Sequence, residues 1–257
     1  MRLSRRAVLT GSLLLVAGAP SVRAGDGLCA GVDLDLFAHR LFQRECGGRK
    51  QNLVWWSPRE AFPSLGIGHF IWPPAGVETP FEATFAHMVR WVGRQGVPAP
   101  RWLRAPHAPW PDRAAFVAEG DSPRIRAARE WLWRTRRLQA AWVVQRFRQR
   151  WVRVLKEQPD AVLLNRRLQR LAQTPGGCWA VLDYVNFKGM GDNPKERYAG
   201  EGWGLLQVLR AMEGDTLADF IAAAGRVLRR RIEHAPRDES PWWPGWRRRL
   251  QSWLEAS

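Results

Sequence analysis

The sequence predicts a mainly α-helical fold with a small β hairpin in its N-terminal third. Apolar residues recur at helical spacing in several segments, the longest of which lies between residues 123 and 158. Short apolar stretches near 53–56 and 64–72 are instead bounded by glycine and proline, which is typical of strands and turns. Hydrophobic residues form 46% and charged residues 25% of the 257 positions, so the chain has the composition of a folded protein.

The first 24 residues have the features of a cleaved export signal. Basic residues that include Arg5 and Arg6 precede an apolar run, and Ala24 supplies the small residue at the expected cleavage site. The arginine pair resembles the twin-arginine signal, and the apolar run is too short to span a bilayer. We therefore expect residues 25–257 to form one soluble domain, periplasmic or secreted by a bacterium, with no transmembrane segment.

The N-terminal third of this domain shows helix, hairpin and helix signals in turn. Residues 33–46 form a short amphipathic pattern that Gly47 ends. A short strand is expected at 53–56, and a turn with a strand at 64–72. A helix is then expected at 81–92, followed by a proline-rich stretch that carries tryptophans.

The rest of the chain is predicted to be helical. Ser122 is a candidate N-cap and Pro159 ends the longest periodic segment, which fits one long helix or two abutting helices. We expect its Ile125, Leu132, Leu138, Trp142 and Leu155 to be buried. Further helices are expected at 160–172, 177–185, 203–212, 216–234 and 241–254.

The chain is strongly basic, with 40 Lys plus Arg against 24 Asp plus Glu and a net charge of +16. The four arginines of the export signal leave the mature chain at +12, and residues 122–158 alone carry +9. Such a charge attracts anionic envelope polymers without selecting among them. The heavy arginine usage of a GC-rich genome explains the net charge equally well. For the basic segment 122–158, a solvated helix face is a better explanation than a dedicated polyanion groove.

Glu45 is the first candidate for a chemical role. At about 100° per residue it lies on the same helix stripe as Leu34 and Leu41, at the last turn. Burial and the negative end of the helix dipole both favour the protonated carboxyl group, which a general acid must deliver to a leaving oxygen. The alternative is that Glu45 simply pairs with an arginine.

Glu45 is followed by Ser64-Leu65-Gly66-Ile67-Gly68-His69, and this combination resembles the phage-type lysozymes. In that family a Glu that ends the first helix precedes a β hairpin carrying Thr-Ile-Gly-Ile-Gly-His. The resemblance implies a lysozyme-like α+β fold with two lobes around a cleft. It also implies that Glu45 is the general acid, that Ser64 places water or substrate, and that His69 supports the hairpin. We assign Gly66, Gly68 and His69 to the substrate-binding wall, although the glycine pair also fits an ordinary strand bend.

The sequence departs from that family at the second carboxylate. Phage-type lysozymes have an Asp nine residues after the catalytic Glu, where this chain has Val54. Glu60 is the nearest substitute and could help Ser64 to orient water, but it fits an exposed loop equally well. A lytic transglycosylase, in which the sugar's own hydroxyl attacks, can operate with one carboxylate, so both mechanisms stay open.

The segment 182–209 has a distinctive composition, with both tyrosines of the chain, and its Gly-Leu-Leu-Gln string weakly resembles lytic transglycosylases. Aromatic faces beside amide and amine donors suit a sugar platform. The alternative is a loop that caps the core. The candidate substrate-binding residues are Tyr184, Asn186, Phe187, Lys188, Trp203 and Gln207.

Other chemistries lack a motif. The five histidines show no metal-ligand spacing, and neither a phosphate loop nor a Gly-x-Ser-x-Gly elbow occurs, so we expect no metal and no cofactor. Cys29, Cys46 and Cys178 allow one disulfide in an oxidising compartment, with three possible pairings. A bridge to Cys46 would steady the end of the Glu45 helix, and a nucleophilic Cys46 is not favoured.

These observations together predict a peptidoglycan-cleaving glycosidase that acts on the β-1,4 bond, either a muramidase or a lytic transglycosylase. Its expected partner is the glycan strand of peptidoglycan, without specific nucleic acid, and the expected state is a monomer. Two other classes stay open. One is a non-catalytic cationic periplasmic protein with a degenerate lysozyme fold that binds peptidoglycan or another envelope polyanion. The other is a secreted cationic binding protein for nucleic acid or membrane.

Overall fold

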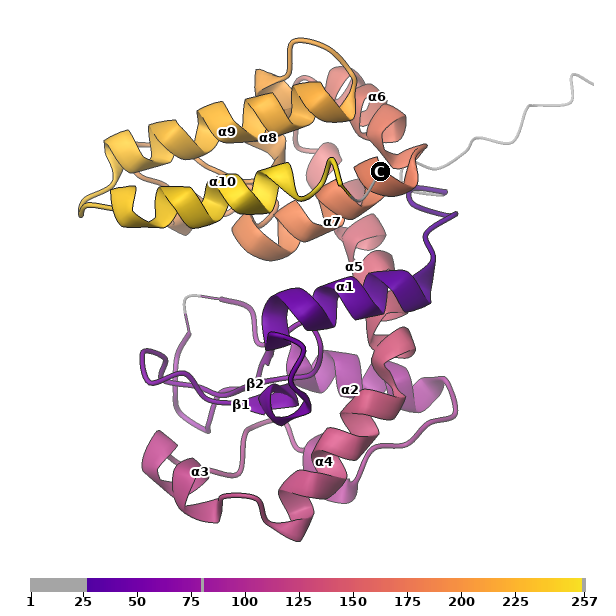
Figure 1. The fold of residues 1–257 in the computed structure, drawn as a ribbon, viewed down its shortest axis with the longest axis vertical. Helices are drawn as coiled ribbons and strands as arrows, with labels where there is room; N and C mark the ends of the chain where they lie inside the picture. The colour runs from indigo at the N-terminus through magenta and orange to yellow at the C-terminus, as the bar shows by residue number, and fades with distance from the viewer. Residues whose placement is uncertain (1–26, 80, 256–257) are drawn as a thin grey trace, which may run out of the picture.

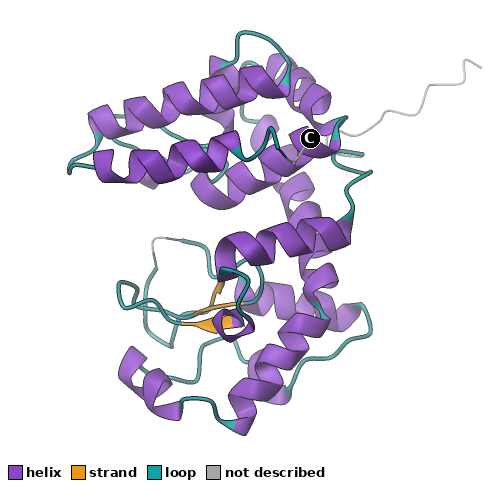
Figure 2. Ribbon diagram, in the orientation of Figure 1, coloured by secondary structure: helices purple, strands orange, loops and turns teal. Residues whose placement is uncertain are grey.

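The computed structural model describes residues 27–79 and 81–255, so the predicted export signal at 1–24 lies outside the described residues. Ten α-helices occur in this part of the chain (Figure 2). They are α1 (Leu34–Cys46), α2 (Phe85–Arg94), α3 (Arg113–Glu119), α4 (Pro123–Arg134), α5 (Arg136–Leu155), α6 (Ala161–Ala172), α7 (Pro175–Lys188), α8 (Leu205–Ala211), α9 (Leu217–His234) and α10 (Trp243–Gln251). Short 3-10 turns also occur at Lys50–Leu53, Arg101–Arg104, Pro194–Glu196 and Ser240–Trp242.

The β structure is one small antiparallel sheet in the order β1-β2-β3. Its strands are β1 (Val54–Trp55), β2 (Ser64–Leu65) and β3 (Phe70–Ile71). Val54 lies opposite Leu65, and Leu65 lies opposite Phe70, and all three side chains are buried. The prediction of a mainly α fold with a small β hairpin is therefore confirmed.

Two helix predictions differ from the structure. The helix expected at 81–92 begins later, at Phe85, and the proline-rich stretch contains the unpredicted helix α3. The Asp112 side chain caps α3 by accepting a hydrogen bond of 2.8 Å from the Ala115 N–H. None of the seven residues of α3 is buried, so the helix leaves no apolar periodicity by which to predict it.

The long basic segment divides into α4 and α5 at Thr135, one of the two predicted outcomes. The buried Thr135 hydroxyl donates a hydrogen bond of 2.8 Å to the Trp131 carbonyl, which satisfies this group at the break. Four of the five apolar residues expected to be buried in this segment are buried, and Leu138 is half-buried. The interior of the segment therefore follows the predicted stripe.

The arginines of this segment contact acidic residues from other parts of the chain. Ion pairs join Arg124 to Glu119, Arg129 to Asp121, Arg137 to Asp35, Arg146 to Glu82 and Arg150 to Asp192. Much of the local +9 charge is thus balanced in space, which favours a solvated, ion-paired face over a dedicated polyanion groove.

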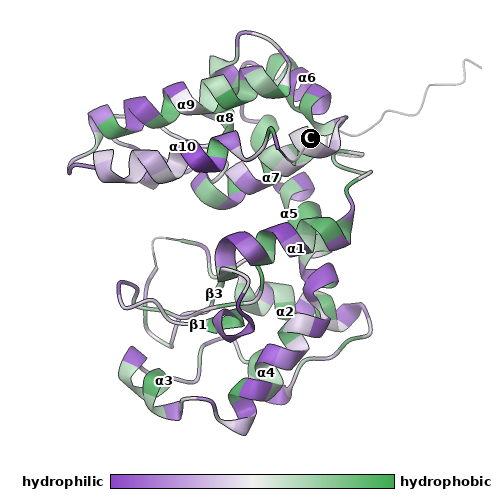
Figure 3. Cartoon of the chain, in the orientation of Figure 1, coloured by the Kyte–Doolittle hydropathy of each residue, from purple (hydrophilic) through white to green (hydrophobic). Residues whose placement is uncertain are grey.

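Helix α5 runs between two groups of elements (Figure 1). Helices α6 to α10 gather at one end of the molecule, whereas the sheet and α2 to α4 gather at the other. Helix α1 packs against α5 between them. Hydrophobic and hydrophilic residues alternate along α4 and α9, as expected of amphipathic helices (Figure 3). No described helix is both long and apolar enough to cross a membrane.

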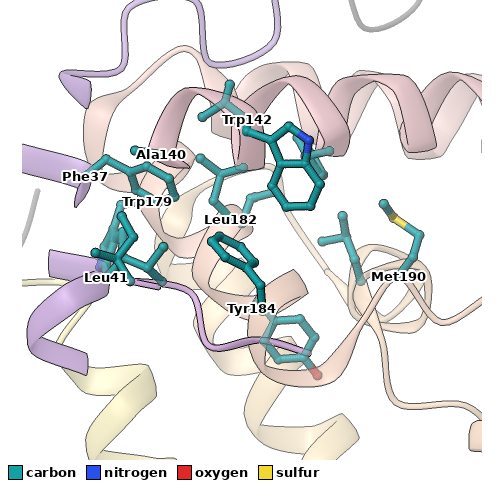
Figure 4. Close-up of a cluster of buried hydrophobic side chains, with 14 of the residues drawn as sticks. Phe37, Leu41, Ala140, Trp142, Trp179, Leu182, Tyr184 and Met190 are labelled. Carbon is teal, nitrogen blue, oxygen red and sulfur yellow. The ribbon is translucent and has the colours of Figure 1, made fainter. Parts of the chain in front are cut away.

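The core connects the two groups through α1, α5 and α7. Side chains that include Leu41, Trp142 and Leu182 meet where these helices approach one another (Figure 4). A disulfide between Cys29 and Cys178, with the two Cα atoms 5.5 Å apart, also ties the segment before α1 to α7. This is one of the three pairings that the sequence allowed, and it leaves Cys46 as a buried thiol.

Candidate active site

Glu45 is positioned by the two ends of α1. The Asp33 carboxylate caps the first turn by accepting hydrogen bonds from the backbone N–H groups of Asp35 at 2.9 Å and Leu36 at 3.0 Å. At the other end Gly47 adopts the left-handed conformation, with φ of 59°, and stops the helix. Glu45 therefore lies in the last turn, with its side chain 20% exposed.

Two long-range partners contact the Glu45 carboxylate. The Asn186 side-chain amide, from α7, donates to Oε1 at 3.0 Å. The Arg249 guanidinium, from α10, donates to the same oxygen at 3.2 Å. Glu45 therefore pairs with an arginine, as the alternative interpretation expected, and its carboxylate also accepts a hydrogen bond from an amide.

Asp183 holds Arg249 in this place. The buried Asp183 carboxylate accepts hydrogen bonds from Arg249 Nε at 2.9 Å and Nη2 at 2.7 Å, and from Trp253 Nε1 at 2.9 Å. Arg44 Nη1 lies 3.6 Å from the same carboxylate. The sequence patterns did not point to Asp183 or Arg249. Asp183 and Asn186 nevertheless stand three residues apart on α7, and this spacing places two side chains on one helix face.

The β2–β3 hairpin is tied to the end of α1. His69 Nε2 lies 3.1 Å from the Asn52 carbonyl oxygen, and the Asn52 side chain donates to the Cys46 carbonyl at 2.9 Å. The Cys46 thiol lies 3.6 Å from the Gly66 carbonyl. Burial lowers the pKa of His69, against the opposite effects of nearby Glu45 and the Asn52 carbonyl. A neutral His69 therefore supports the hairpin next to Glu45.

The two glycines of the hairpin turn are required by packing. Gly66 has φ of +81°, and a Cβ there would come within 2.5 Å of Gln139 Oε1. That buried oxygen accepts a hydrogen bond of 3.0 Å from the Ile67 N–H, so α5 holds the turn. A Cβ on Gly68 would lie 2.7 Å from the Phe70 ring. Gly66 is buried, so the prediction that it contacts substrate is wrong; Gly68 is half-buried.

Ser64 lies on the open side of the sheet. It pairs with Trp55, so the two side chains share one face, and Trp55 is 42% exposed. Val54, at the position of the missing second carboxylate, points to the buried face. Glu60 is exposed in the loop between β1 and β2, and its carbonyl accepts a hydrogen bond of 2.9 Å from Trp56 Nε1. Among the described contacts of the Glu45 carboxylate, none comes from Glu60.

The predicted sugar platform is wrong for its two largest aromatic residues. The Tyr184 ring is fully buried among core side chains, and its hydroxyl donates to the Trp203 carbonyl at 2.7 Å (Figure 4). Trp203 is only 2% exposed. Neither ring can stack on a sugar, because both rings are buried. Tyr184 and Trp203 instead fit the alternative interpretation, in which this segment caps the core.

The remaining platform residues divide between structural and exposed roles. Gln207 binds the backbone through both ends of its amide, accepting from the Gly204 N–H at 3.0 Å and donating to the Gly191 carbonyl at 3.1 Å. Phe187 and Lys188 are half-buried, and the Phe187 ring lies 4.4 Å from the Arg249 guanidinium carbon. Gln207 therefore fixes the loop, whereas Phe187 belongs to the surroundings of Glu45.

Lys188 lies in an aromatic environment beside this group. Its Nζ is 3.7 Å from the Trp246 ring centroid and 4.3 Å from that of Phe187. Burial lowers the pKa of Lys188 to about 7, and nearby Arg231 adds to the effect. The charge of Lys188 thus depends on its packing.

The structure disfavours thiol chemistry at Cys46. Burial, with Glu45 beside it, raises the pKa of Cys46 to about 12, which leaves the thiol protonated and poorly nucleophilic. Within the described residues, no three His, Cys, Asp or Glu side chains gather closely enough to hold a metal ion.

No protein-family model, curated protein or solved structure matches the chain. The chemistry of the site must therefore be argued from its geometry. That geometry offers one partly accessible carboxyl group, held by an amide and a guanidinium, next to a hairpin with a half-buried serine.

Proposed function

We propose that the protein cleaves the β-1,4 glycan bond of peptidoglycan, with Glu45 as the general acid. The observation that carries this proposal is the position of Glu45. It ends the first long helix, lies beside the Gly-Ile-Gly-His hairpin, and has a partly exposed carboxyl group oriented by side chains from two other helices.

The arrangement of the elements agrees with a substrate site at Glu45. Helix α5 runs between the two groups of elements, and α1 packs against it there (Figure 1). Glu45, in the last turn of α1, contacts Asn186 of α7 and Arg249 of α10. We infer a lysozyme-like molecule in which the glycan strand lies between two lobes, against the open face of Ser64 and Trp55 on one side and Asn186 on the other. This position would put the scissile oxygen within reach of Glu45.

The proposed reaction needs one proton and one nucleophile. Glu45 donates its proton to the glycosidic oxygen as the bond from that oxygen to the sugar C1 breaks, and an oxygen nucleophile captures the resulting carbon cation. The proton that the nucleophile loses returns to the Glu45 carboxylate. Water would give a reducing end, with Ser64 orienting it. Attack by the sugar's own C6 hydroxyl would give a 1,6-anhydro end. The buried Val54 at the usual aspartate position favours the second route, because that route requires no second carboxylate.

The decisive experiment is mass spectrometry of soluble fragments released from purified peptidoglycan. The mature protein should release muropeptides, and Glu45→Gln should reduce the rate about 10²- to 10⁴-fold. Glu60→Gln is the matched control, since it alters an exposed glutamate in the same part of the chain. Retained activity in Glu45→Gln would remove the assignment, and loss in Glu60→Gln as well would identify Glu60 as the second carboxylate.

A non-catalytic peptidoglycan-binding protein is the second candidate, favoured by the ion pair between Glu45 and Arg249. This candidate predicts that wild type and Glu45→Gln both sediment with purified peptidoglycan and release nothing. Either function places the protein in the periplasm. Mass spectrometry of the exported protein should then show an N-terminus at Gly25.

A further inference from the structure

Arg249 contacts two carboxylates of different character. It meets Asp183 through two hydrogen bonds, at 2.9 Å and 2.7 Å, but meets Glu45 through a single one at 3.2 Å. Asp183 is fully buried, whereas the Glu45 side chain is 20% exposed. Asp183 is therefore the stronger ionic partner of Arg249, and Glu45 is the weaker one. The same Asp183 carboxylate also lies 3.6 Å from Arg44 Nη1, so two arginines share it.

This distinction matters for proton transfer. An unpaired arginine beside Glu45 would hold the carboxylate ionised, and an ionised carboxylate cannot act as a general acid. An arginine whose charge is balanced by a buried aspartate keeps its hydrogen bond to Glu45 but exerts a much weaker field on it. Asp183 thus holds Arg249 in contact with Glu45 and weakens the electric field that Arg249 exerts on that carboxyl group.

We propose that Asp183 is a positioning residue that holds Arg249 against Glu45 and, by neutralising Arg249, sets the pH range in which Glu45 carries a proton. The part of this proposal that concerns catalysis rests on the proposed function. The electrostatic coupling itself can be measured without any substrate.

The other charged and titratable groups around Glu45 are present in every variant of the experiment described below. Arg44 and Cys46 flank it on α1, and His69 faces it from the hairpin. Arg44 keeps its charge in every variant but loses its 3.6 Å contact when Asp183 is replaced. A change in the titration of Glu45 on substitution of Asp183 therefore reports the field of Asp183 with both arginines, and Arg249→Gln separates the part that belongs to Arg249.

The experiment is a pH titration of the Glu45 side-chain carboxyl by carbon NMR in the mature protein with ¹³C-labelled glutamate, with the resonance assigned from its absence in Glu45→Gln. Asp183→Asn leaves the arginine unbalanced and should move the Glu45 midpoint down by about one pH unit. Arg249→Gln leaves the aspartate unbalanced and should move it up by a similar amount. The double variant has neither charge and should return to within about half a unit of wild type.

The double variant keeps the test decisive if Asp183→Asn does not fold, because it removes both partners of the buried pair. Only Arg44, whose side chain is 20% exposed, then lacks its contact with Asp183. A double variant that titrates like Arg249→Gln would show that Asp183 does not act on Glu45, and so would an unchanged midpoint in a folded Asp183→Asn. If glycan cleavage is also observed, the alkaline limb of its pH profile should follow the NMR midpoints. If the wild type cleaves nothing and the midpoints still move as described, the proposed function fails while the coupling stands.

Discussion

Glu239 and Glu45 are two of the glutamates that contact arginines, and their surroundings differ. Glu239 is fully buried and meets Arg231 through two hydrogen bonds, at 2.7 Å and 3.0 Å, and also accepts a hydrogen bond of 3.1 Å from the Tyr198 hydroxyl. Glu45 is partly exposed and has one contact to Arg249 at 3.2 Å and one to Asn186 at 3.0 Å, both on the same oxygen. An arginine partner therefore does not by itself distinguish a structural carboxylate from a functional one. The two carboxylates differ in their exposure and in the number of hydrogen bonds that they accept from their arginines.

The pKa of Glu239 agrees with a structural role. Burial raises its pKa, but the hydrogen bonds and charge of Arg231, together with Tyr198, outweigh that effect and leave the pKa below its usual value. Glu239 is thus a permanent anion that connects α9 to the loop before α10.

The largest expected difference between the two glutamates is in activity. Glu45→Gln should abolish glycan cleavage while leaving the melting temperature within a few degrees of wild type, because the amide keeps an oxygen to accept from Asn186. Glu239→Gln should keep its turnover per folded molecule. Thermal unfolding followed by circular dichroism, alongside the muropeptide assay, tests both statements; a Glu45→Gln protein that unfolds early would make Glu45 structural.

The second difference is in stability. Glu239→Gln leaves Arg231 buried without its anion and should lower the free energy of unfolding by about 3 kcal/mol. For a domain of this size that corresponds to a fall in melting temperature of roughly 8 °C. Urea denaturation of Glu239→Gln and Glu45→Gln in parallel measures it, and equal stabilities would contradict the comparison.

A smaller effect is expected at Asn186. Removing its amide with Asn186→Ala takes one hydrogen bond from a partly exposed carboxylate and should reduce kcat about tenfold, equivalent to about 1.4 kcal/mol. Initial rates on purified glycan strands, with Gln173→Ala as a surface amide control, check this. A change confined to KM would instead assign Asn186 to sugar binding.

The smallest effect is expected at a third pair, Glu119 with Arg124, where the arginine is 42% exposed. The hydrogen bond from Arg124, opposed by burial, lowers the pKa of Glu119 to about 2 from its usual 4.5. Because the folded form holds its proton less tightly, the stabilisation is complete above pH 4.5 and is lost as the pH falls to 2. Glu119→Gln should cost about 1 kcal/mol at pH 7 and nothing at pH 2, measured by urea denaturation across that range. A cost that persists at pH 2 would point to packing instead.

The local signals in the sequence predicted local structure well. The Asp33 cap and Gly47 define α1 because both act within one turn, and the helix break at Thr135 falls where either of two helix arrangements was expected. Helix α3 escaped prediction because it buries no side chain.

The candidate site was predicted only in part, because two of its residues lie far from Glu45 in the sequence. Glu45 and its neighbouring hairpin lie close together in sequence, but Asn186 is 141 residues away and Arg249 is 204 residues away. Tyr184 and Asn186 occupy one helix and have the composition of a sugar site, yet the tertiary packing of α7 buries one and exposes the other. The composition of this segment indicated that α7 carries residues of the site, but only the tertiary packing shows which of them are exposed.

The disulfide has a consequence for the order of events during oxidative folding. Cys29 and Cys178 are 149 residues apart, whereas Cys46 is much nearer to Cys29 in the sequence, so the pairing that the folded protein lacks closes the shorter loop. The thiol of Cys46 lies buried against the Gly66 carbonyl. Early formation of the hairpin against α1 would therefore shield Cys46 and leave Cys29 to pair with Cys178. The hairpin that carries the Gly-Ile-Gly-His motif would then prevent incorrect disulfide pairing while the rest of the chain folds.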